Sequence, residues 1–203
     1  MFIPYIGSGG PFFLPDGTQV ISGFNHLITE PAIYNSYKDY DKRKTQLIAS
    51  KVFVGASFNV ATEDDLKITD YNRPFTLKYL DKHQVVGTQQ TSTNTPILRY
   101  SDILLVYAEA CGPTTEGYNA INQIRNRAGL MPLTPSLDTQ TFRDSVLVER
   151  AWELAFEGNR LFDLRRTNNM EKVLEDQYGK TIQTGAYFFA IPQTEVDNNP
   201  YID

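Results

Sequence analysis

The stretch Glu149–Arg166, with the sequence ERAWELAFEGNRLFDLRR, is the part of the chain that decides its fold. Its eighteen residues hold three glutamates, one aspartate, four arginines and three large aromatic residues. Gly158 interrupts this run of charged and aromatic residues and predicts a bend or a close backbone approach. Apolar residues recur at helical spacing from just before this stretch into it, which predicts one amphipathic helix through the stretch. They are Leu147, Ala151, Leu154 and Ala155.

Charged residues of opposite sign stand three positions apart in this stretch, in the pairs Glu157–Arg160 and Asp163–Arg166. Such pairs meet on a helical surface and contribute roughly 0.2–0.5 kcal/mol each. A dense charge network beside apolar side chains indicates a structural role, with Arg150 and Arg160 compensating the glutamates. The expected members of this network are Glu149, Arg150, Glu153, Glu157, Arg160, Asp163 and Arg166.

Four further segments of the chain carry motifs that belong with this stretch. They are Tyr40–Arg43 (YDKR), Ile97–Ala110 (ILRYSDILLVYAEA), Ala120–Leu130 (AINQIRNRAGL) and Ala190–Pro200 (AIPQTEVDNNP). Together with the first stretch, these blocks resemble the C-terminal signature of the SusD/RagB family of nutrient-binding outer-membrane lipoproteins. The resemblance adds structural signature residues at Asp41, Arg43, Arg99, Glu109, Arg125 and Arg127.

This resemblance implies a mainly α fold with a helical hairpin, long irregular loops and a minor β-sheet. It also implies a cell-surface protein, anchored through a lipid outside this chain, that captures a nutrient glycan without any cofactor. The implied partners are a SusC-like TonB-dependent transporter and the family's N-terminal half, which is expected to be missing here. Two alternatives stay open: a structural or docking portion that contacts the transporter while ligand contacts lie elsewhere, and a peptide- or glycoprotein-binding homologue.

The candidate ligand-binding segment is the aromatic, loop-like region of residues 1–30, which glycine and proline punctuate. Sugar rings have apolar C–H faces and polar rims, so flat aromatic side chains beside amides suit them. The alternative is that these aromatics pack against the core or the missing half. The expected ligand-binding residues are Tyr5, Phe12, Phe13, Phe24, Asn25 and His26.

The rest of the secondary structure follows from periodicity and from glycine and proline. Ser101–Cys111 is apolar nearly all round, which predicts a helix buried on every side. Glu116–Ala128, capped by Gly129, is expected to lie antiparallel to it as a helical hairpin. The other expected elements are a helix over Glu30–Leu47, strands over Lys51–Val60 and Phe75–Tyr79, a loop at Pro132 and Pro135, and a helix beginning near Thr141.

The length of 203 residues and the net charge of −5 bound the class of protein. We expect a single domain over residues 1–203. The negative charge argues against nucleic-acid binding, which needs a concentrated positive field. The one cysteine, Cys111, cannot form an intramolecular disulfide and is expected to pack in the core, as is Trp152. No apolar run is long enough to span a membrane.

Enzymatic templates fail in this sequence. Nucleophilic catalysis needs a base such as histidine, and zinc binding needs several ligands of that kind. The only two histidines of the sequence are His26 and His83. The acidic run Glu63–Asp65 lacks the calcium-loop pattern. Glu149, Glu153 and Glu157 would stand about 6 Å apart on a continuous helix, between the carboxylate separations of the two glycosidase classes. Because arginine partners lower a carboxyl pKa, we expect no general acid there and no enzyme activity.

Overall fold

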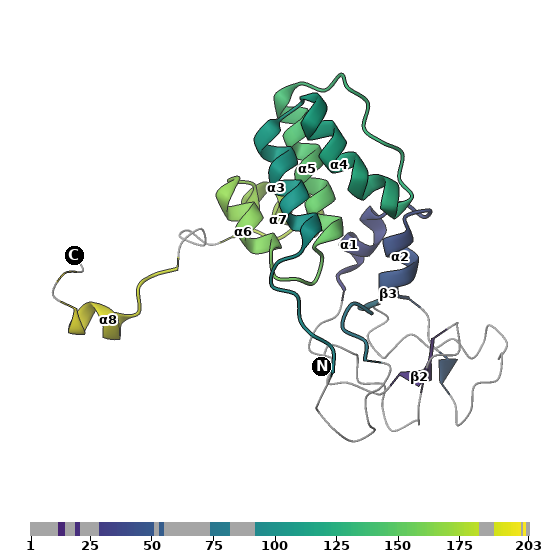
Figure 1. The fold of residues 1–203 in the computed structure, drawn as a ribbon. Coiled ribbons are helices and arrows are strands. Elements are labelled where there is room, and N and C mark those ends of the chain that lie inside the picture. The colour runs from purple at the N-terminus through teal and green to yellow at the C-terminus, as the bar shows by residue number, and fades with distance from the viewer. Residues whose placement is uncertain are drawn as a thin grey trace. The chain divides into compact units, whose positions relative to one another are not determined.

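The structure is a computed structural model that describes residues 12–14, 19–20, 29–50, 53–54, 74–81, 92–182, 189–199 and 201. Its contacts divide the chain into two compact units, Met1–Arg160 and Leu161–Asp203. Helices dominate the described residues, as expected from the sequence (Figure 1). None of these helices combines the length and the apolar character that crossing a bilayer requires. The expectation of one domain over the whole chain stays a prediction.

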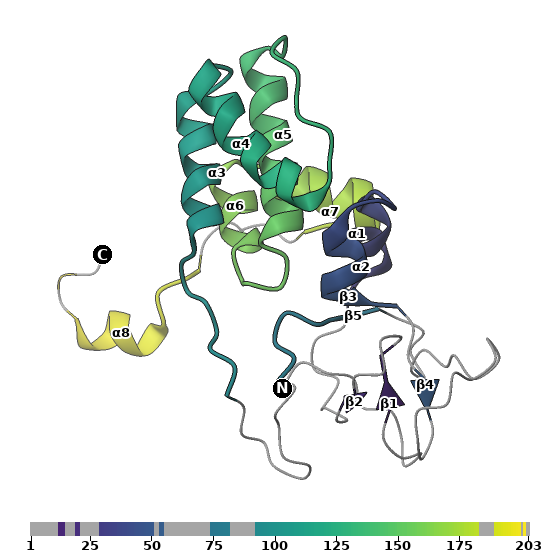
Figure 2. The same ribbon diagram turned by 45° about the vertical axis from the view of Figure 1, so that its right-hand side comes forward.

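The first unit is organised around the helical hairpin of α3 (Tyr100–Cys111) and α4 (Thr115–Ala128), as predicted. Figures 1 and 2 show the two helices side by side and antiparallel. Gly112 ends α3 with φ 64°, and the Thr114 hydroxyl begins α4 by accepting a hydrogen bond from the Gly117 amide. Gly129, in the left-handed conformation at φ 79°, ends α4. Local capping residues therefore set the hairpin.

The third helix of the core, α5 (Thr139–Glu153), packs on both arms of the hairpin. Asp138 caps its start by accepting hydrogen bonds from the Gln140 and Thr141 amides. The rings of Tyr118 and Phe142 meet edge to face with centroids 4.8 Å apart. The buried core between the three helices consists of Leu105, Ala108, Tyr118, Ala120, Ile121, Ile124, Phe142 and Val146.

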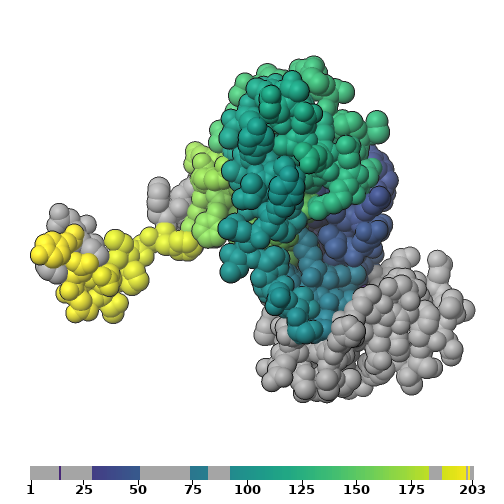
Figure 3. Space-filling view, viewed as in Figure 1, coloured from purple at the N-terminus to yellow at the C-terminus, as the bar shows by residue number. Residues whose placement is uncertain are grey.

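One face of α3 is exposed, so the prediction of a helix buried on every side is wrong. Tyr100 is 71% exposed and Ile103 is 53% exposed, and Val106 and Tyr107 are each half exposed. Figure 3 shows α3, in teal, at the surface of the molecule. The reason is that α4 and α5, the two helices that pack extensively on α3, both lie on its other side. Cys111, at its end, is likewise only partly buried.

The predicted helix over Glu30–Leu47 is two short helices, α1 (Pro31–Ser36) and α2 (Lys42–Leu47). Pro31 stands in the first turn of α1, as expected. The break arises because Asp41 caps α2: its side chain accepts a hydrogen bond of 2.9 Å from the Arg43 amide. An aspartate in this extended conformation starts a helix and does not continue one.

Two small antiparallel sheets belong to the same unit. One has the strand order β2 (Gln19–Val20), β1 (Phe12–Phe13), β4 (Phe53–Val54). The other pairs β3 (Ile48–Ala49) with β5 (Phe75–Thr76). The predicted strand over Phe75–Tyr79 is therefore shorter than expected, and that over Lys51–Val60 is described only at β4. Sequence reasoning missed β3.

The stretch Glu149–Arg166 is not one helix, contrary to the prediction. α5 ends at Glu153, and α6 begins at Arg160 and ends at Arg166. Between them, Phe156 and Gly158 have φ values of 69° and 82°, a left-handed conformation that cannot continue a right-handed helix. The bend predicted at Gly158 is present, and the turn begins several residues before it.

The second unit, Leu161–Asp203, contains most of α6 together with α7 (Met170–Tyr178) and α8 (Gln193–Asn198). The Arg166 guanidinium lies 2.8 Å from the buried carboxylate of Asp163, which confirms that predicted pair. Gly179 ends α7 with φ 60°. Neither α7 nor α8 was among the elements that the sequence predicted.

Candidate functional site: a charged pocket at the end of α5

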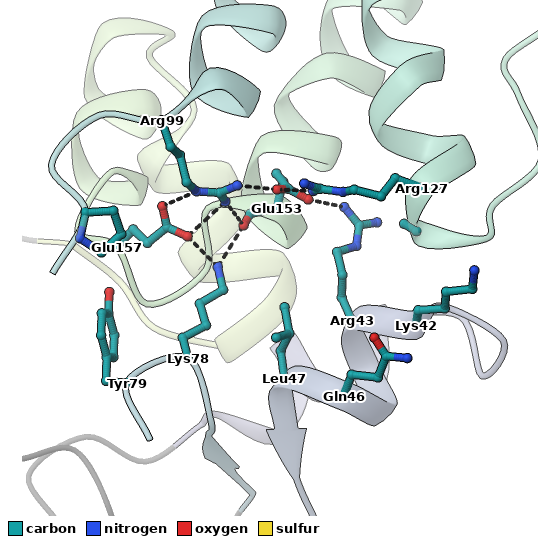
Figure 4. A pocket seen from close by; sticks show the side chains of 12 residues that line it. Lys42, Arg43, Gln46, Leu47, Lys78, Tyr79, Arg99, Arg127, Glu153 and Glu157 are labelled. Carbon is teal, nitrogen blue, oxygen red and sulfur yellow. Dashed lines mark hydrogen bonds and ion pairs between the residues drawn. The ribbon is translucent and has the colours of Figure 1, made fainter. Parts of the chain in front are cut away.

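A cavity of about 410 Å³ lies in the first unit, beside α2 and the end of α5. Charged side chains from five parts of the chain surround it (Figure 4). The lining residues are Lys42, Arg43, Gln46, Leu47, Lys78, Tyr79, Pro96, Arg99, Arg127, Ala128, Glu153 and Glu157.

Arg43 of α2 anchors the wall of this pocket. Its guanidinium lies 2.7 Å from Asp41 and 2.7 Å from Glu149, and 3.2 Å from Glu153. All four side chains are almost fully buried. Burial lowers the pKa of Arg43, but the hydrogen bond to Asp41 and the charge of Glu149 outweigh it and raise the pKa. Arg43 therefore stays charged and joins α2 to α5.

Glu153, the last residue of α5, binds two further arginines. Its Oε1 accepts hydrogen bonds from Arg99, which precedes α3, and from Arg127 of α4. Burial raises the pKa of Glu153, whereas the hydrogen bonds from Arg127 and Arg99 lower it, and the net pKa is about 2. The carboxylate is therefore ionised at neutral pH and ties α2, α4 and α5 to the segment before α3.

Lys78 and Glu157 complete the network at the turn after α5. The Lys78 ammonium donates to the backbone oxygens of Glu153 at 2.7 Å and Ala155 at 2.8 Å, and also to the Glu157 carboxylate. Arg99 donates to Glu157 from Nε at 2.7 Å. Burial lowers the pKa of Lys78, and Glu157 partly offsets this effect. Cations thus satisfy the free carbonyls at the end of α5.

Tyrosines hold the same turn through their hydroxyl groups. Tyr79 donates 2.8 Å to the carbonyl oxygen of Phe156, the residue in the left-handed conformation. Tyr37 donates 2.8 Å to the carbonyl oxygen of Trp152, and the indole of Trp152 donates 2.9 Å to Ser36. Trp152 is half-buried, so its predicted place in the core is wrong: it packs at the edge of α1.

Most of the predicted signature residues meet in this network, with partners other than those expected. Compensation for the glutamates was assigned to Arg150 and Arg160. The structure supplies it from α2, α4 and the segment before α3, and Glu149 also binds Arg125 at 2.9 Å. The members brought together are Asp41, Arg43, Arg99, Arg125, Arg127, Glu149, Glu153 and Glu157.

Other signature residues lie outside the pocket. Arg150 binds Asp102 of α3 at 2.8 Å, and Glu109 lies 3.5 Å from Arg143. Arg160 donates to the carbonyl oxygen of Leu147. Sequence reasoning missed Lys78, because no motif surrounds it. Its position inside the predicted strand Phe75–Tyr79 was the only available signal.

The chemistry of the pocket is that of fixed charges. A glycosidase needs one carboxyl group with a raised pKa as general acid. The pKa of Glu153 is lowered, and Glu157 binds both Lys78 and Arg99. Within the described part of the chain, no group of three or more potential ligands could hold a metal ion.

The predicted ligand-binding residues fall mostly outside the described residues. Phe12 and Phe13 form β1, and of these only the backbone pairing is described. Tyr5, Phe24, Asn25 and His26 lie beyond the described ranges, as do His83 and the Glu63–Asp65 run. Their role in binding stays a prediction.

Comparison with known proteins agrees with the motifs and the helical core. The chain belongs to the SusD family, whose model matches residues 28–203. It is 33% identical over 130 residues to SusD-like protein P38 of Formosa agariphila, covering 59% of this chain and 24% of that protein.

Solved structures share the fold. A SusD superfamily protein of Parabacteroides distasonis has a TM-score of 0.71 at 25% identity, covering 98% of this chain and 44% of that one. Surface glycan-binding protein A of Bacteroides thetaiotaomicron has a TM-score of 0.66 at 25% identity, covering 98% and 43%. This chain therefore spans less than half the length of each of these three relatives.

Proposed function

We propose that the chain is part of a cell-surface protein that binds a nutrient glycan and delivers it to a SusC-like TonB-dependent transporter in the outer membrane. The observation that carries this proposal is membership of the SusD family. The likeness to surface glycan-binding protein A of Bacteroides thetaiotaomicron supports a glycan as the ligand class. The proposed activity is binding alone, without bond cleavage and without a cofactor.

The proposed ligand contacts are the aromatic and polar residues near the start of the chain. Antiparallel pairing of β1 with β2 and β4 holds the Phe12–Phe13 backbone in a small sheet. The backbone that carries these two aromatic residues is therefore fixed in position. Leu14, directly after β1, is buried and anchors this strand. The proposed set is Tyr5, Phe12, Phe13, Phe24, Asn25 and His26.

The test is calorimetric titration of the full chain with a panel of neutral oligosaccharides, peptides and glycopeptides. Sites of this kind give affinities of ~4–8 kcal/mol, in the micromolar to millimolar range. Replacing Phe12 and Phe13 by alanine is expected to weaken glycan binding by about 0.5–1.5 kcal/mol per stacking contact. The matched control is Phe162→Ala, because Phe162 is an exposed phenylalanine of the second unit. A chain that binds no glycan, or binds only peptides, would refute the proposal.

A second candidate function is that this part of the protein is a docking portion, with ligand contacts elsewhere. The exposed apolar face of α3, with Tyr100, Ile103, Val106 and Tyr107, favours it. Contiguous apolar patches beyond ~300–600 Å² mark interaction surfaces. Sedimentation at several concentrations, with a hydrophobic dye and with a separately made N-terminal half of a relative, tests this role. A chain that stays monomeric, does not bind the dye and does not bind this N-terminal half would exclude the docking role.

A further inference from the structure

The ion-pair network around the pocket carries more positive than negative charge. Five cations, Arg43, Lys78, Arg99, Arg125 and Arg127, face four carboxylates, Asp41, Glu149, Glu153 and Glu157. The pocket is also lined by Lys42, which raises the excess from one to two positive charges among the described residues. The whole chain, in contrast, has a net charge of −5. Positive charge is therefore concentrated at this cavity.

Within the described part of the chain, the inner cations have their donors engaged, whereas the outer ones keep donors without a partner. Arg43 and Arg99 each use all their side-chain nitrogens on carboxylates, Ser101 or a backbone oxygen, and Lys78 binds three acceptors. At the mouth, the Arg127 side chain is 59% exposed and uses Nη2 on Glu153. A ligand would therefore meet its unbonded charge at the mouth and not in the interior.

Two residues of α2 line this pocket together with Arg127. Lys42 and Gln46 stand four positions apart, on one face of α2, and both are exposed. A Cβ atom placed on Gly129 would lie 3.5 Å from Cε of Lys42, so the lysine stem lies against the end of α4. Figure 4 shows the side chains of all three around the same pocket.

We propose that Lys42, Gln46 and Arg127, which line one pocket, bind the oxyanions of an acidic saccharide, either carboxylates or sulfate esters. The saccharide part rests on the glycan-binding function proposed above. A guanidinium fork and an ammonium are the groups that recognise oxyanions, and the amide of Gln46 adds a neutral donor. The ligand class is therefore an acidic glycan.

The dimensions and the walls of the pocket fit this ligand. Its volume of about 410 Å³ lies within the ~300–1,000 Å³ usual for small-molecule sites. Leu47, Pro96 and Tyr79 add apolar surface to the lining of the pocket, suited to the C–H face of a sugar ring. The ion pair with Glu153 holds the Arg127 guanidinium in place at the pocket.

The experiment compares matched saccharides by calorimetry on the full chain. One arm uses trigalacturonate and its neutral methyl ester. The other uses a sulfated galactan tetrasaccharide and its desulfated form, so that the two arms distinguish a carboxylate from a sulfate ester. We expect at least one acidic form to bind roughly tenfold more tightly than its neutral partner, because hydrogen bonds to charged groups are the stronger ones. This preference should shrink with added salt.

Variants at the mouth assign the effect to this pocket. Lys42→Met keeps the aliphatic stem and removes the charge, and Gln46→Ala removes the amide. Both residues are exposed and belong to no buried ion pair among those described, so the fold should be retained. Each change should weaken the acidic saccharide, Lys42→Met by roughly tenfold, and leave its neutral partner unchanged. Lys172→Met, at an exposed lysine of α7, is the matched control.

Equal affinity for acidic and neutral saccharides, or an acidic preference that Lys42→Met leaves intact, would overturn this inference and leave the proposed glycan-binding function standing. Failure of every saccharide in the comparison and in the wider panel would overturn both.

Discussion

Replacing Glu153 by glutamine is the sharpest test of the charged network, because the change removes one charge and keeps the shape of the side chain. Glu153 is 3% exposed and binds Arg43, Arg99 and Arg127. Removing one partner of a buried ion pair costs about 3–5 kcal/mol, since the remaining charges are left uncompensated. The pKa of Glu153, lowered from 4.5 to about 2, gives an independent figure on the order of 3 kcal/mol.

The same shift fixes the pH dependence of this loss. Because the folded pKa lies below the unfolded value, ionised Glu153 stabilises the fold above about pH 4.5, and this stabilisation is lost as the pH falls toward 2. The difference in unfolding free energy between the wild type and Glu153→Gln should therefore be full at pH 7. It should shrink steadily between pH 4.5 and pH 2.

Urea denaturation followed by circular dichroism, at a series of pH values, measures this difference. Glu175→Gln, at an exposed glutamate of α7, is the control and should change stability by less than ~0.5 kcal/mol. A Glu153→Gln variant as stable as the wild type at pH 7 would refute the reasoning. So would a difference that stays constant down to pH 2.

Two further outcomes are expected. Gly117→Ala should destabilise the helical hairpin by about 1–3 kcal/mol, because its Cβ would lie 2.0 Å from the carbonyl oxygen of Gly112; thermal melting beside Asn119→Ala, at an exposed position of α4, measures this loss. Incubation with varied oligosaccharides should give no cleavage products in mass spectrometry, because arginines and a lysine bind the pocket carboxylates. Products that disappear in Glu153→Gln or Glu157→Gln would contradict the binding-only function.

The helical hairpin could be predicted because its signals are local. Gly129 caps α4 as predicted, and Gly112 ends α3 within the same short range. The start of α4 was predicted one residue late, because the cap at Thr114 was not recognised. The break after Glu153 could not be predicted in the same way. Leu154 and Ala155 continue the apolar spacing of α5, while the turn depends on Phe156, whose left-handed conformation is held by hydrogen bonding to Tyr79.

The partners in the charged network escaped prediction for a related reason. A pattern of spacings reports residues three or four apart on one helix. Glu149, however, binds Arg43, 106 positions away in the chain, and Glu157 binds Lys78, 79 positions away. The identity of the charged residues was therefore visible in the sequence, but their pairing required the fold.

The excess positive charge links the stability of the pocket to its proposed ligand. Buried ion pairs contribute little net stability, because desolvation offsets their attraction, but each charge then depends on its partner for position. In this chain Glu153 holds Arg127, and the end of α4 holds the stem of Lys42. Cations that are already held in place lose little conformational entropy when a ligand binds, which favours affinity. A glycan bearing an oxyanion would supply the negative charge that balances the excess positive charge of the pocket.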